Sequence, residues 1–297
     1  RLAHACLIDG ARFSGATLRP WRHNDANDLE HHLRWARQKH PKSRVFVVTE
    51  SVFSMDGDVA PLREIVELKD RHGAVLVLDE AHAIGVLGRG GRGLADELRL
   101  ASRIEVQMGT LGKALGSSGG YVAGSRVLTD VVTNRARSFI FSTAPPASAA
   151  AAASAALDIC AGPEGDRRRA RLRELAALLD PAMPAAIFPV ILGGESDALR
   201  ASEALGKLGF FVPAIRPPAV PPGTSRLRVS LSAAHEPDDV RRLAAHLRAL
   251  PRGAADAGGD PDSVCPVCGG PLVQEKCKVV CRSATCGHRI VFNCSEF

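Results

Sequence analysis

The sequence predicts an α/β fold with a mostly parallel sheet, followed by a smaller α+β domain and a cysteine-rich module at the C-terminus. Residues 45–49 and 74–78 are apolar runs without polar alternation, as expected of parallel strands covered on both faces. A helical pattern lies between them. The residues from Cys265 to Phe297 hold six of the eight cysteines, which marks a separate module.

The first apolar run opens the unit that makes the sheet parallel. A helix follows it, starting at Pro61, whose fixed φ suits a first helical turn, with Leu62, Ile65 and Val66 on one stripe. The second apolar run must then return by a right-handed crossover, which places ligands at the carboxyl ends of the strands. Asp79 stands at such an end.

Alternating helices and strands continue beyond residue 125. We expect helices at 125–138, 146–157, 195–208 and 237–250, an arginine-rich helix after Gly162, and strands at 188–192, 211–215 and 226–231. The helix at 146–157 is almost entirely alanine and should pack tightly. Residues 251–262 are dense in Gly, Pro and Asp and predict a flexible linker. The expected domains are a large-domain part at 1–160, a small α+β domain at 161–250, the linker, and the cysteine module at 263–297.

Composition predicts a globular protein, because 45% of the 297 residues are hydrophobic and can bury a substantial core. The formal net charge is +6, but aromatic residues make up only 4% and the basic run at 167–173 fits an exposed helix. We therefore do not expect nucleic acid as a partner. We find neither an apolar stretch long enough to span a membrane nor a secretory leader at Arg1, so we expect no membrane partner and a cytoplasmic location.

Lys113 and Asp79 form the most informative pair in the chain. Lys113 lies in a glycine-flanked run from Gly109 to Gly116, and we expect it to be a buried amine that forms a Schiff base with an aldehyde. A carboxylate at a strand end can hold a protonated pyridine nitrogen. Taken singly, each residue is more often a solvated loop lysine or a helix N-cap. Together they predict a pyridoxal phosphate site.

The run from Asp79 to His82 also spells the acidic box of a helicase ATPase. A phosphate-binding loop ending at Lys113 would need glycine in place of Gln107 and a hydroxyl residue in place of Ala114. It should also precede the acidic strand rather than follow it. The spacing therefore excludes an ATPase.

Several further segments, in this order, carry a resemblance to a known family: 1–5, 23–25, 52–58, 79–82, 109–116, 139–143, 215–218 and 227–231. Over residues 1–250 the chain resembles the α-oxoamine synthases, which are pyridoxal phosphate enzymes. The resemblance implies the PLP-dependent transferase fold type I, with 1–160 as the C-terminal part of the cofactor-binding large domain.

The resemblance also implies roles for the four catalytic candidates. Lys113 would bind the cofactor's aldehyde and move the substrate α-proton, while Asp79 would pair with the pyridinium. His82 would hydrogen-bond the phenolic oxygen, and His4 would stack on the ring. The reaction implied is the decarboxylative condensation of an amino acid with an acyl-CoA to an aminoketone.

Five more residues complete the site that the resemblance implies. Ser54 would line the cofactor and Thr110 would contact its phosphate. Ser142 and Thr143 would reach the phosphate of the other subunit, which makes a homodimer part of the site. Arg228 would bind the amino acid carboxylate. Each of these residues has an ordinary structural role when it is considered alone.

Five other residues have simpler expected roles. We interpret the run 23–25 as structural and Cys6 and Cys160 as core residues. Family members carry a segment ahead of the part that matches Arg1. Without it, sheet edges and apolar faces would stay uncovered, so we expect low stability and weak cofactor retention of this chain alone.

The C-terminal cysteines predict a zinc ribbon. Two thiolate pairs can supply four tetrahedral sulfur ligands, and a segment with so few large apolar residues needs such a site to fold. The expected ligands are Cys265, Cys268, Cys281 and Cys286. The second pair is loosely spaced, so Cys277, Cys294 or His288 remains an alternative ligand, and disulfides remain an alternative to zinc.

Two alternatives to the main functional interpretation stay open. The chain could be another member of the same family, with a different amino acid such as glycine as its substrate. It could also be an inactive remnant that serves as a zinc-ribbon binding module. The acyl chain and the amino acid cannot be inferred from these residues.

Overall fold

The computed structural model describes residues 2–250, 272–275, 278–281 and 289–291. The chain divides into two compact units, one of residues 3–186 with 232–234 and one that contains 187–231 and the residues from 235 onward. The helix after Gly162 groups with the first unit, because Arg169 near its start bonds to Cys160. The division thus falls later than the domain boundary expected at residues 160 and 161.

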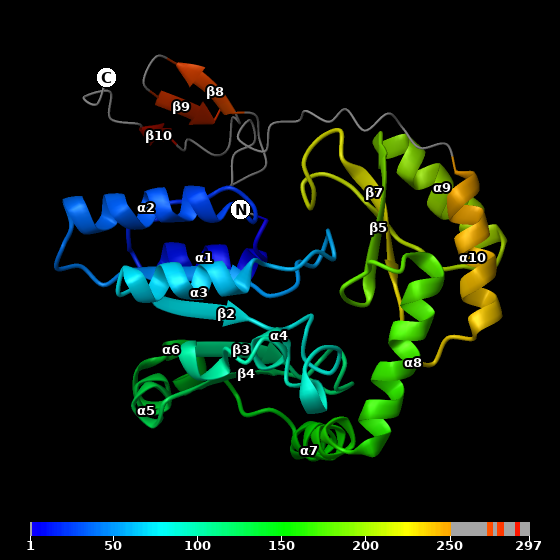
Figure 1. The fold of residues 1–297 in the computed structure, drawn as a ribbon, viewed down its shortest axis with the longest axis horizontal. Coiled ribbons are helices and arrows are strands. Elements are labelled where there is room, and N and C mark those ends of the chain that lie inside the picture. Colours follow the sequence, from blue (N-terminus) through cyan, green and yellow to red (C-terminus); the bar gives the residue numbers. More distant parts are fainter. Residues whose placement is uncertain (1, 251–271, 276–277, 282–288, 292–297) are drawn as a thin grey trace. The chain divides into compact units, whose positions relative to one another are not determined.

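The larger unit contains a sheet of order β1-β2-β3-β4 in the described part of the chain (Figure 1). Its strands are β1 (Phe46–Glu50), β2 (Val75–Asp79), β3 (Val106–Thr110) and β4 (Gly120–Gly124). β1, β2 and β3 run parallel, and β4 is antiparallel to β3. The expected strands at 45–49 and 74–78 and their parallel pairing are confirmed.

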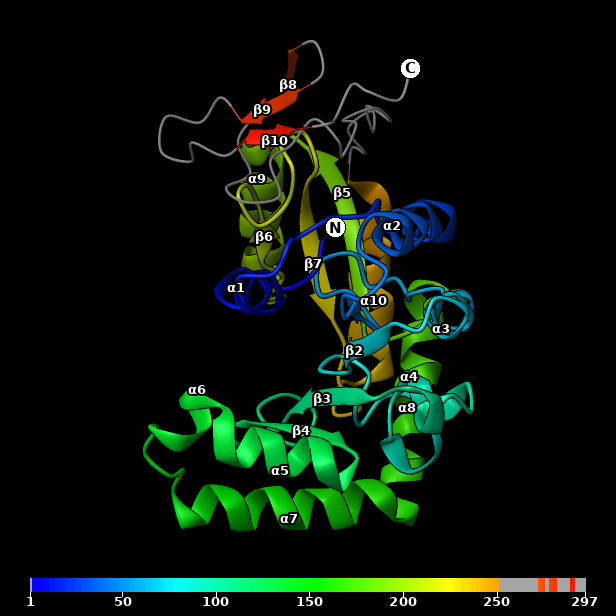
Figure 2. The ribbon, with the colours of Figure 1, turned by 90° about the vertical axis from the view of Figure 1, so that its left-hand side faces the viewer.

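Helices lie on both sides of this sheet. The helices before and between its strands are α1 (Ala5–Phe13), α2 (Ala26–Lys39), α3 (Leu62–Arg71) and α4 (Leu94–Glu97), with short 3-10 turns η1 (Arg89–Gly91) and η2 (Ala101–Arg103). Figure 2 shows α1 on the opposite side of β2 from α2 and α3. Leu62, Ile65 and Val66 of α3 are buried in the main core, as their stripe predicts.

Side-chain alternation decides which strand residues face that core. Val47, Leu76 and Leu78 belong to the core cluster beneath α2 and α3. Because successive side chains of a strand point to opposite faces, Glu50 and Asp79 face the other side, where α1 lies. This second face is where the candidate site forms.

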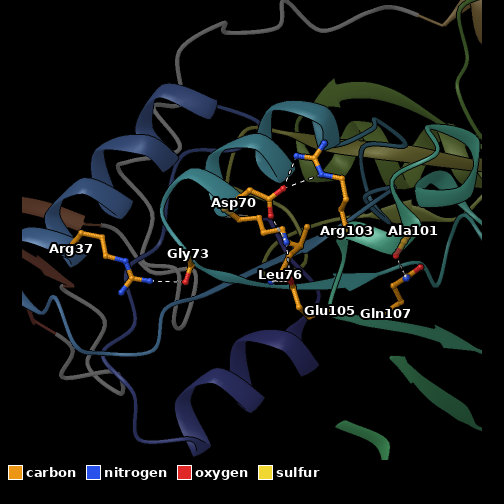
Figure 3. Close-up of polar contacts among 9 residues, drawn as sticks. Arg37, Asp70, Gly73, Leu76, Ala101, Arg103, Glu105 and Gln107 are labelled. Atoms are coloured by element: carbon orange, nitrogen blue, oxygen red, sulfur yellow. Dashed lines mark hydrogen bonds and ion pairs between the residues drawn. The ribbon is translucent and has the colours of Figure 1, made fainter. Parts of the chain in front are cut away.

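An ion-pair network ties α3 to the sheet (Figure 3). The Lys69 ammonium, only 3% exposed, lies 2.7 Å from an oxygen of Asp70 and 2.6 Å from Oε1 of Glu105. Glu105 also accepts the main-chain N–H of Leu76 at 2.8 Å, and Arg103 pairs with Asp70 at 2.6 Å. Burial alone would lower the pKa of Lys69, but the hydrogen bonds to the two carboxylates outweigh it and raise the pKa.

The second half of the larger unit is helical. It contains α5 (Arg126–Arg135), α6 (Arg137–Ile140), α7 (Ala147–Ala161) and α8 (Pro163–Leu179), and α7 and α8 run in different directions on either side of Gly162 (Figure 2). The helix expected at 125–138 is interrupted at Ala136, whose backbone is extended. The expected tight packing of the alanine-rich α7 is wrong for this structure, because Ala153 is its one buried residue.

The smaller unit contains an antiparallel sheet of order β5-β7-β6 in the described residues, with α9 and α10. The elements are β5 (Ile187–Gly193), α9 (Glu195–Lys207), β6 (Ala214–Ile215), β7 (Ser225–Ser230) and α10 (Pro237–Ala249). These match the predicted elements, except that β6 is shorter than the run at 211–215.

The described C-terminal segments form a three-stranded antiparallel sheet of order β10-β9-β8. Its strands are β8 (Leu272–Glu275), β9 (Lys278–Cys281) and β10 (Arg289–Val291). Three of the four predicted zinc ligands and the side chain of Cys281 lie outside the described residues. Within the described residues, no group of metal-ligating side chains gathers and no helix is long and apolar enough to cross a membrane.

Candidate active site

A cavity of about 270 Å³ lies at the carboxyl ends of β1, β2 and β3. These strands end at Glu50, Asp79 and Thr110, and strand pairing places Glu50 beside Asp79 and Asp79 beside Met108. The residues lining the cavity are His4, Cys6, Glu50, Asp79, Ala81, His82, Met108, Thr110 and Lys113. Its volume is near the lower end of small-molecule sites, which is about 300 Å³.

Asp79 is a buried carboxylate that is held by the main chain. Its Oδ1 accepts the main-chain N–H of Ala81 at 2.8 Å. Burial raises the pKa of Asp79, while that N–H and the charges of Lys113 and His4 oppose the rise. A buried carboxylate of this kind is stabilised by a cationic partner placed in the cavity.

Lys113 and His82 meet across the cavity. Nζ of Lys113 lies 2.9 Å from Nε2 of His82. This is the distance of a hydrogen bond between the two nitrogens, so the imidazole and the amine are direct neighbours. The fold thus brings together two predicted site residues that are far apart in the chain.

The loop between β3 and β4 carries Lys113 at its tip. Thr110 holds the base of this loop, because its Oγ1 accepts the N–H of Gly112 at 3.1 Å and donates to the carbonyl of Gly119 at 3.2 Å. Lys113 itself is exposed. The expectation of a buried amine is therefore wrong for this structure, since no described element covers the loop tip.

His4 enters the cavity at the start of α1. It is the N-cap of that helix, and its Nδ1 accepts the N–H of Cys6 at 3.3 Å. Sγ of Cys6 lies 3.0 Å from the same nitrogen. The main-chain N–H of Cys6 therefore fixes the orientation of the His4 ring at the helix start.

Cys6 is not a core residue, contrary to expectation. It is exposed and lines the cavity. Partial burial of its sulfur, followed by the charges of Asp79 and Glu50, raises the pKa of the Cys6 thiol. Cys160 is half-buried, next to the guanidinium of Arg169.

Glu50 is the site residue that the sequence analysis missed. It is 2% exposed, and burial raises its pKa to about 7, opposed chiefly by a hydrogen bond from the main-chain N–H of His4. The available signal was its position directly after the apolar run at 45–49, equivalent to Asp79 after the run at 74–78. Adjacent parallel strands bring such equivalent ends together.

Four predicted site residues do not line this cavity. Ser54 is half-buried in the turn between β1 and α3. Ser142 and Thr143 are exposed after α6, and the Ser142 hydroxyl donates to the carbonyl of Ser138. Arg228 belongs to the other compact unit, where it donates to Oγ of Ser230 at 2.8 Å and burial lowers its pKa.

The interpretation of His23, Asn24 and Asp25 as structural residues agrees with their contacts. His23 and Asn24 each lie 2.7 Å from Oδ2 of Asp58, and Asp25 caps α2 by accepting two main-chain N–H groups. Asp58 closes the turn that carries Ser54, because its carbonyl accepts the N–H of Phe53. These residues fix a loop and do not line the cavity.

Glu80 explains the rest of the acidic tetrapeptide. It is 1% exposed and accepts the N–H groups of Leu94 and Ala95 at 3.0 and 2.8 Å, where α4 begins. Glu80 therefore stabilises a helix start on the other side of the strand end from Asp79. This role is structural and agrees with the exclusion of an ATPase.

The donor set of the cavity fits pyridoxal phosphate. Asp79 offers a buried carboxylate to a pyridinium nitrogen, and Lys113 offers an amine to an aldehyde. His82 offers an imidazole beside that amine, and His4 offers a ring at the rim. The side chain of Thr110 lies at the same strand end.

Comparisons with known proteins agree with this donor set. The family model described as "Aminotransferase class I and II" matches residues 1–247. The 8-amino-7-oxononanoate synthase of Anaeromyxobacter dehalogenans (strain 2CP-C) is 51% identical over 261 residues, which cover 84% of this chain and 64% of that protein. The enzyme of the same name from Bordetella petrii is 47% identical over 266 residues, covering 86% and 66%.

Solved structures show the same fold. A serine palmitoyltransferase of S. paucimobilis with bound PLP and myriocin matches with a TM-score of 0.78 and 31% identity, over 84% of this chain and 64% of that one. The 8-amino-7-oxononanoate synthase of Francisella tularensis matches with a TM-score of 0.70 and 25% identity, over 83% and 72%. The chain spans about 64% of the length of the curated relatives named first. The matched region, the fold type I sheet and the cavity at its carboxyl edge agree, and the chain belongs to the aminotransferase class I and II family.

Proposed function

We propose that this chain is the larger part of a PLP-dependent acyltransferase that condenses an amino acid with an acyl-CoA. The observation that carries the proposal is the single cavity shared by His4, Asp79, His82 and Lys113. The bound amino acid loses its α-proton, a carbon–carbon bond forms to the thioester carbonyl, and the CoA thiol leaves. Loss of the carboxylate as carbon dioxide and return of a proton to the α-carbon give the aminoketone.

Pyridoxal phosphate, when bound, supplies the electron sink that makes the α-proton acidic. Asp79 keeps the ring nitrogen protonated, because an ionised carboxylate favours the adjacent positive charge. Lys113 binds the aldehyde and later takes the α-proton, His82 donates to the phenolic oxygen, and His4 packs on the ring.

The remaining roles follow from family resemblance. Thr110 contacts the phosphate, Ser54 lines the cofactor, and Arg228 binds the amino acid carboxylate. Ser142 and Thr143 reach the phosphate of the partner in a homodimer. Their exposure, next to exposed apolar residues of α6, supports a surface available to a second copy.

The identity to enzymes of that name supports 8-amino-7-oxononanoate synthase as the specific activity, with L-alanine and a pimeloyl thioester as substrates in biotin synthesis. The likeness to serine palmitoyltransferases supports, as a second candidate, another α-oxoamine synthase, of which 2-amino-3-ketobutyrate CoA ligase is one. Incubation with alanine, glycine or serine and several acyl thioesters, with product analysis by mass spectrometry, separates these candidates.

Lys113→Ala tests the cofactor site directly. We expect the wild-type chain to develop a visible absorbance band with pyridoxal phosphate, and borohydride to fix the cofactor on Lys113. The variant should lose both, whereas the control Lys207→Ala, which changes an exposed lysine of α9, should keep both. A band of equal strength in Lys113→Ala would refute the assignment.

The cysteine-rich module is proposed to bind zinc through Cys265, Cys268, Cys281 and Cys286. The support is their spacing in the sequence, since thiolate pairs of this kind suit a tetrahedral ion. Metal analysis of the purified chain before and after mild chelation tests it. One zinc per chain is expected, and disulfides found by mass spectrometry in place of zinc would overturn it. A chain that binds zinc but no pyridoxal phosphate would instead support an inactive enzyme remnant that acts as a binding module.

A further inference from the structure

Glu50 has no part in the function proposed above, although it is among the most buried residues of the cavity. It ends β1, pairs in register with Asp79, and lines the same space as Lys113. A carboxyl group that is 2% exposed is costly to bury unless a specific partner compensates for the lost water.

Glu50 is tied to the start of α1 through the main chain of His4. Oε1 of Glu50 accepts the N–H of His4, the residue that caps the start of α1. None of the nine residues of α1 is fully buried, and its packed side is limited to partly buried residues such as Leu7 and Ile8, so contacts at its start matter for its position. A carboxylate at a helix N-terminus is also favoured by the helix dipole. Glu50 thus holds the one end of α1 that carries His4.

The charged groups around Glu50 come from four elements. Asp79 of β2 opposes its ionisation, while Lys113 of the β3–β4 loop and His23 ahead of α2 favour it. From α1, the N–H of His4 favours ionisation, and the Cys6 thiol is close enough to be affected by the charge of Glu50. In every protonation state Glu50 retains a carbonyl-type oxygen that can accept the His4 N–H.

We propose that Glu50 is a positioning residue, which fixes the His4 main chain and so holds the imidazole at the rim of the cofactor cavity. The inference rests on the proposed function, in which that imidazole packs on the cofactor ring. The proposal predicts that the length of the side chain at position 50 matters more than its charge. A side chain long enough to accept the His4 N–H should position His4 whether it is charged or neutral.

Two variants separate reach from charge. Glu50→Gln keeps the length and an acceptor oxygen but loses the charge, whereas Glu50→Asp keeps the charge and is shorter by one methylene. Affinity for pyridoxal phosphate, measured by titration of the visible band, should stay within about threefold of wild type in Glu50→Gln. It should fall on the order of tenfold in Glu50→Asp and Glu50→Ala. Asp9→Asn, at an exposed position on α1, is the matched control and should bind like wild type.

The cofactor-free protein gives an independent readout. NMR spectra of the histidine-labelled chain report on the His4 imidazole, whose resonance is assigned by its loss in His4→Gln. This resonance should be unchanged in Glu50→Gln and shifted in Glu50→Asp. This comparison decides the Glu50–His4 link even if wild type binds no pyridoxal phosphate, a result that would sink the proposed function instead.

A double-mutant cycle tests whether Glu50 acts through His4. In a His4→Ala background, Glu50→Asp should reduce pyridoxal phosphate affinity by less than about twofold, because the group that it positions is gone. Fully additive losses would overturn the proposal. Glu50→Asp that binds like wild type, or Glu50→Gln that is as impaired as Glu50→Ala, would overturn it as well.

Discussion

Two carboxyl groups, those of Glu50 and Asp79, end adjacent strands and share one cavity. Burial raises the pKa of both, and the charge of Asp79 raises the pKa of Glu50 further. Such a pair favours a bound cation and titrates closer to neutral pH than ordinary carboxyl groups do.

The pH dependence of stability should report the buried Glu50. Its pKa is about 7 in the folded protein and 4.5 in the reference state, so its contribution to stability is complete below about pH 4.5 and is lost as pH rises through 7. We expect urea unfolding between pH 5 and 8 to show this loss in wild type and not in Glu50→Gln. The free energy of unfolding of the variant, relative to that of wild type, should therefore increase with pH, by about 3 kcal/mol at most. In the control Glu174→Gln, at an exposed position, the free energy of unfolding should depend on pH as it does in wild type. The same pH dependence in Glu50→Gln would refute the raised pKa of Glu50.

Cys6 should be a slow nucleophile despite its exposure. Its pKa is raised by burial of the sulfur and by the charges of Asp79 and Glu50, so little thiolate is present at neutral pH. Alkylation by iodoacetamide, followed by mass spectrometry, should be slower at Cys6 than for free cysteine at pH 8. Replacing Glu50 by Gln should speed it, and an unchanged rate would contradict the influence of that charge.

At the residue scale, the spacing of Lys113 and Asp79 indicated the site, and the family resemblance added His4, His82 and Thr110; all five line one cavity. They were predictable because their residue types are rare in combination. Glu50 and Cys6 were not identified, because an acid after a strand and a small thiol in a helix have common structural explanations. Both residues belong to the site only because the fold brings them next to residues that are distant in the sequence, such as Asp79 and Lys113.

At the element scale, the site depends on α3 holding β2 in place. The Lys69 ammonium is buried between Asp70 and Glu105, and Glu105 also holds the main chain of Leu76 in β2. These contacts connect the helix to two neighbouring strands whose ends form the cavity (Figure 3). Loss of the central cation would leave its carboxylate partners uncompensated.

Lys69→Met should destabilise the larger unit by about 1–3 kcal/mol. The value is below that of a fully buried ion pair, because Asp70 and Glu105 are 42% and 43% exposed and water screens them. Urea unfolding gives the measurement. Lys207→Met, which removes an exposed pair with Glu203 in α9, should change stability by less than about 0.5 kcal/mol. Equal effects of the two substitutions would contradict the role of burial.

In the larger unit, the strands that were predicted from the sequence are those with continuous apolar runs. β1 and β2 are continuous apolar runs, whereas β3 and β4 contain Gln107 and several glycines and gave no strand pattern. Their pairing supplies what the local sequence lacks, because β3 lies between two partners. α5 likewise ends at Arg135, where the local pattern would have continued the helix.

At the scale of the whole molecule, apolar side chains stay on the surface of the larger unit. Val127, Phe139 and Phe141 are 74%, 62% and 72% exposed, and they lie on α5, on α6 and directly after α6. Ser142 and Thr143 follow Phe141 in the chain. Large exposed apolar side chains grouped near proposed site residues are typical of a protein–protein interface.

Phe141→Asp should weaken self-association. Removing a buried phenylalanine from an interface and placing a charge there costs affinity on the order of tenfold or more. Sedimentation velocity over a range of chain concentrations gives the dissociation constant. Phe211→Asp is the control, because Phe211 is 95% exposed and belongs to the other compact unit. A monomeric wild type, or equal weakening by both substitutions, would refute the proposed homodimer surface.

The sequence by itself determined the α/β class, the parallel β1–β2 pair and the motif that places Lys113 and Asp79 at one site. These depend on local apolar runs and on residue types whose spacing is diagnostic. Only the tertiary structure decided that Glu50 and Cys6 belong to the cavity, that Lys113 is exposed, and that α7 buries little more than Ala153. The physical reason is that burial and proximity are set by which distant elements pack together, and local sequence patterns do not record those partners.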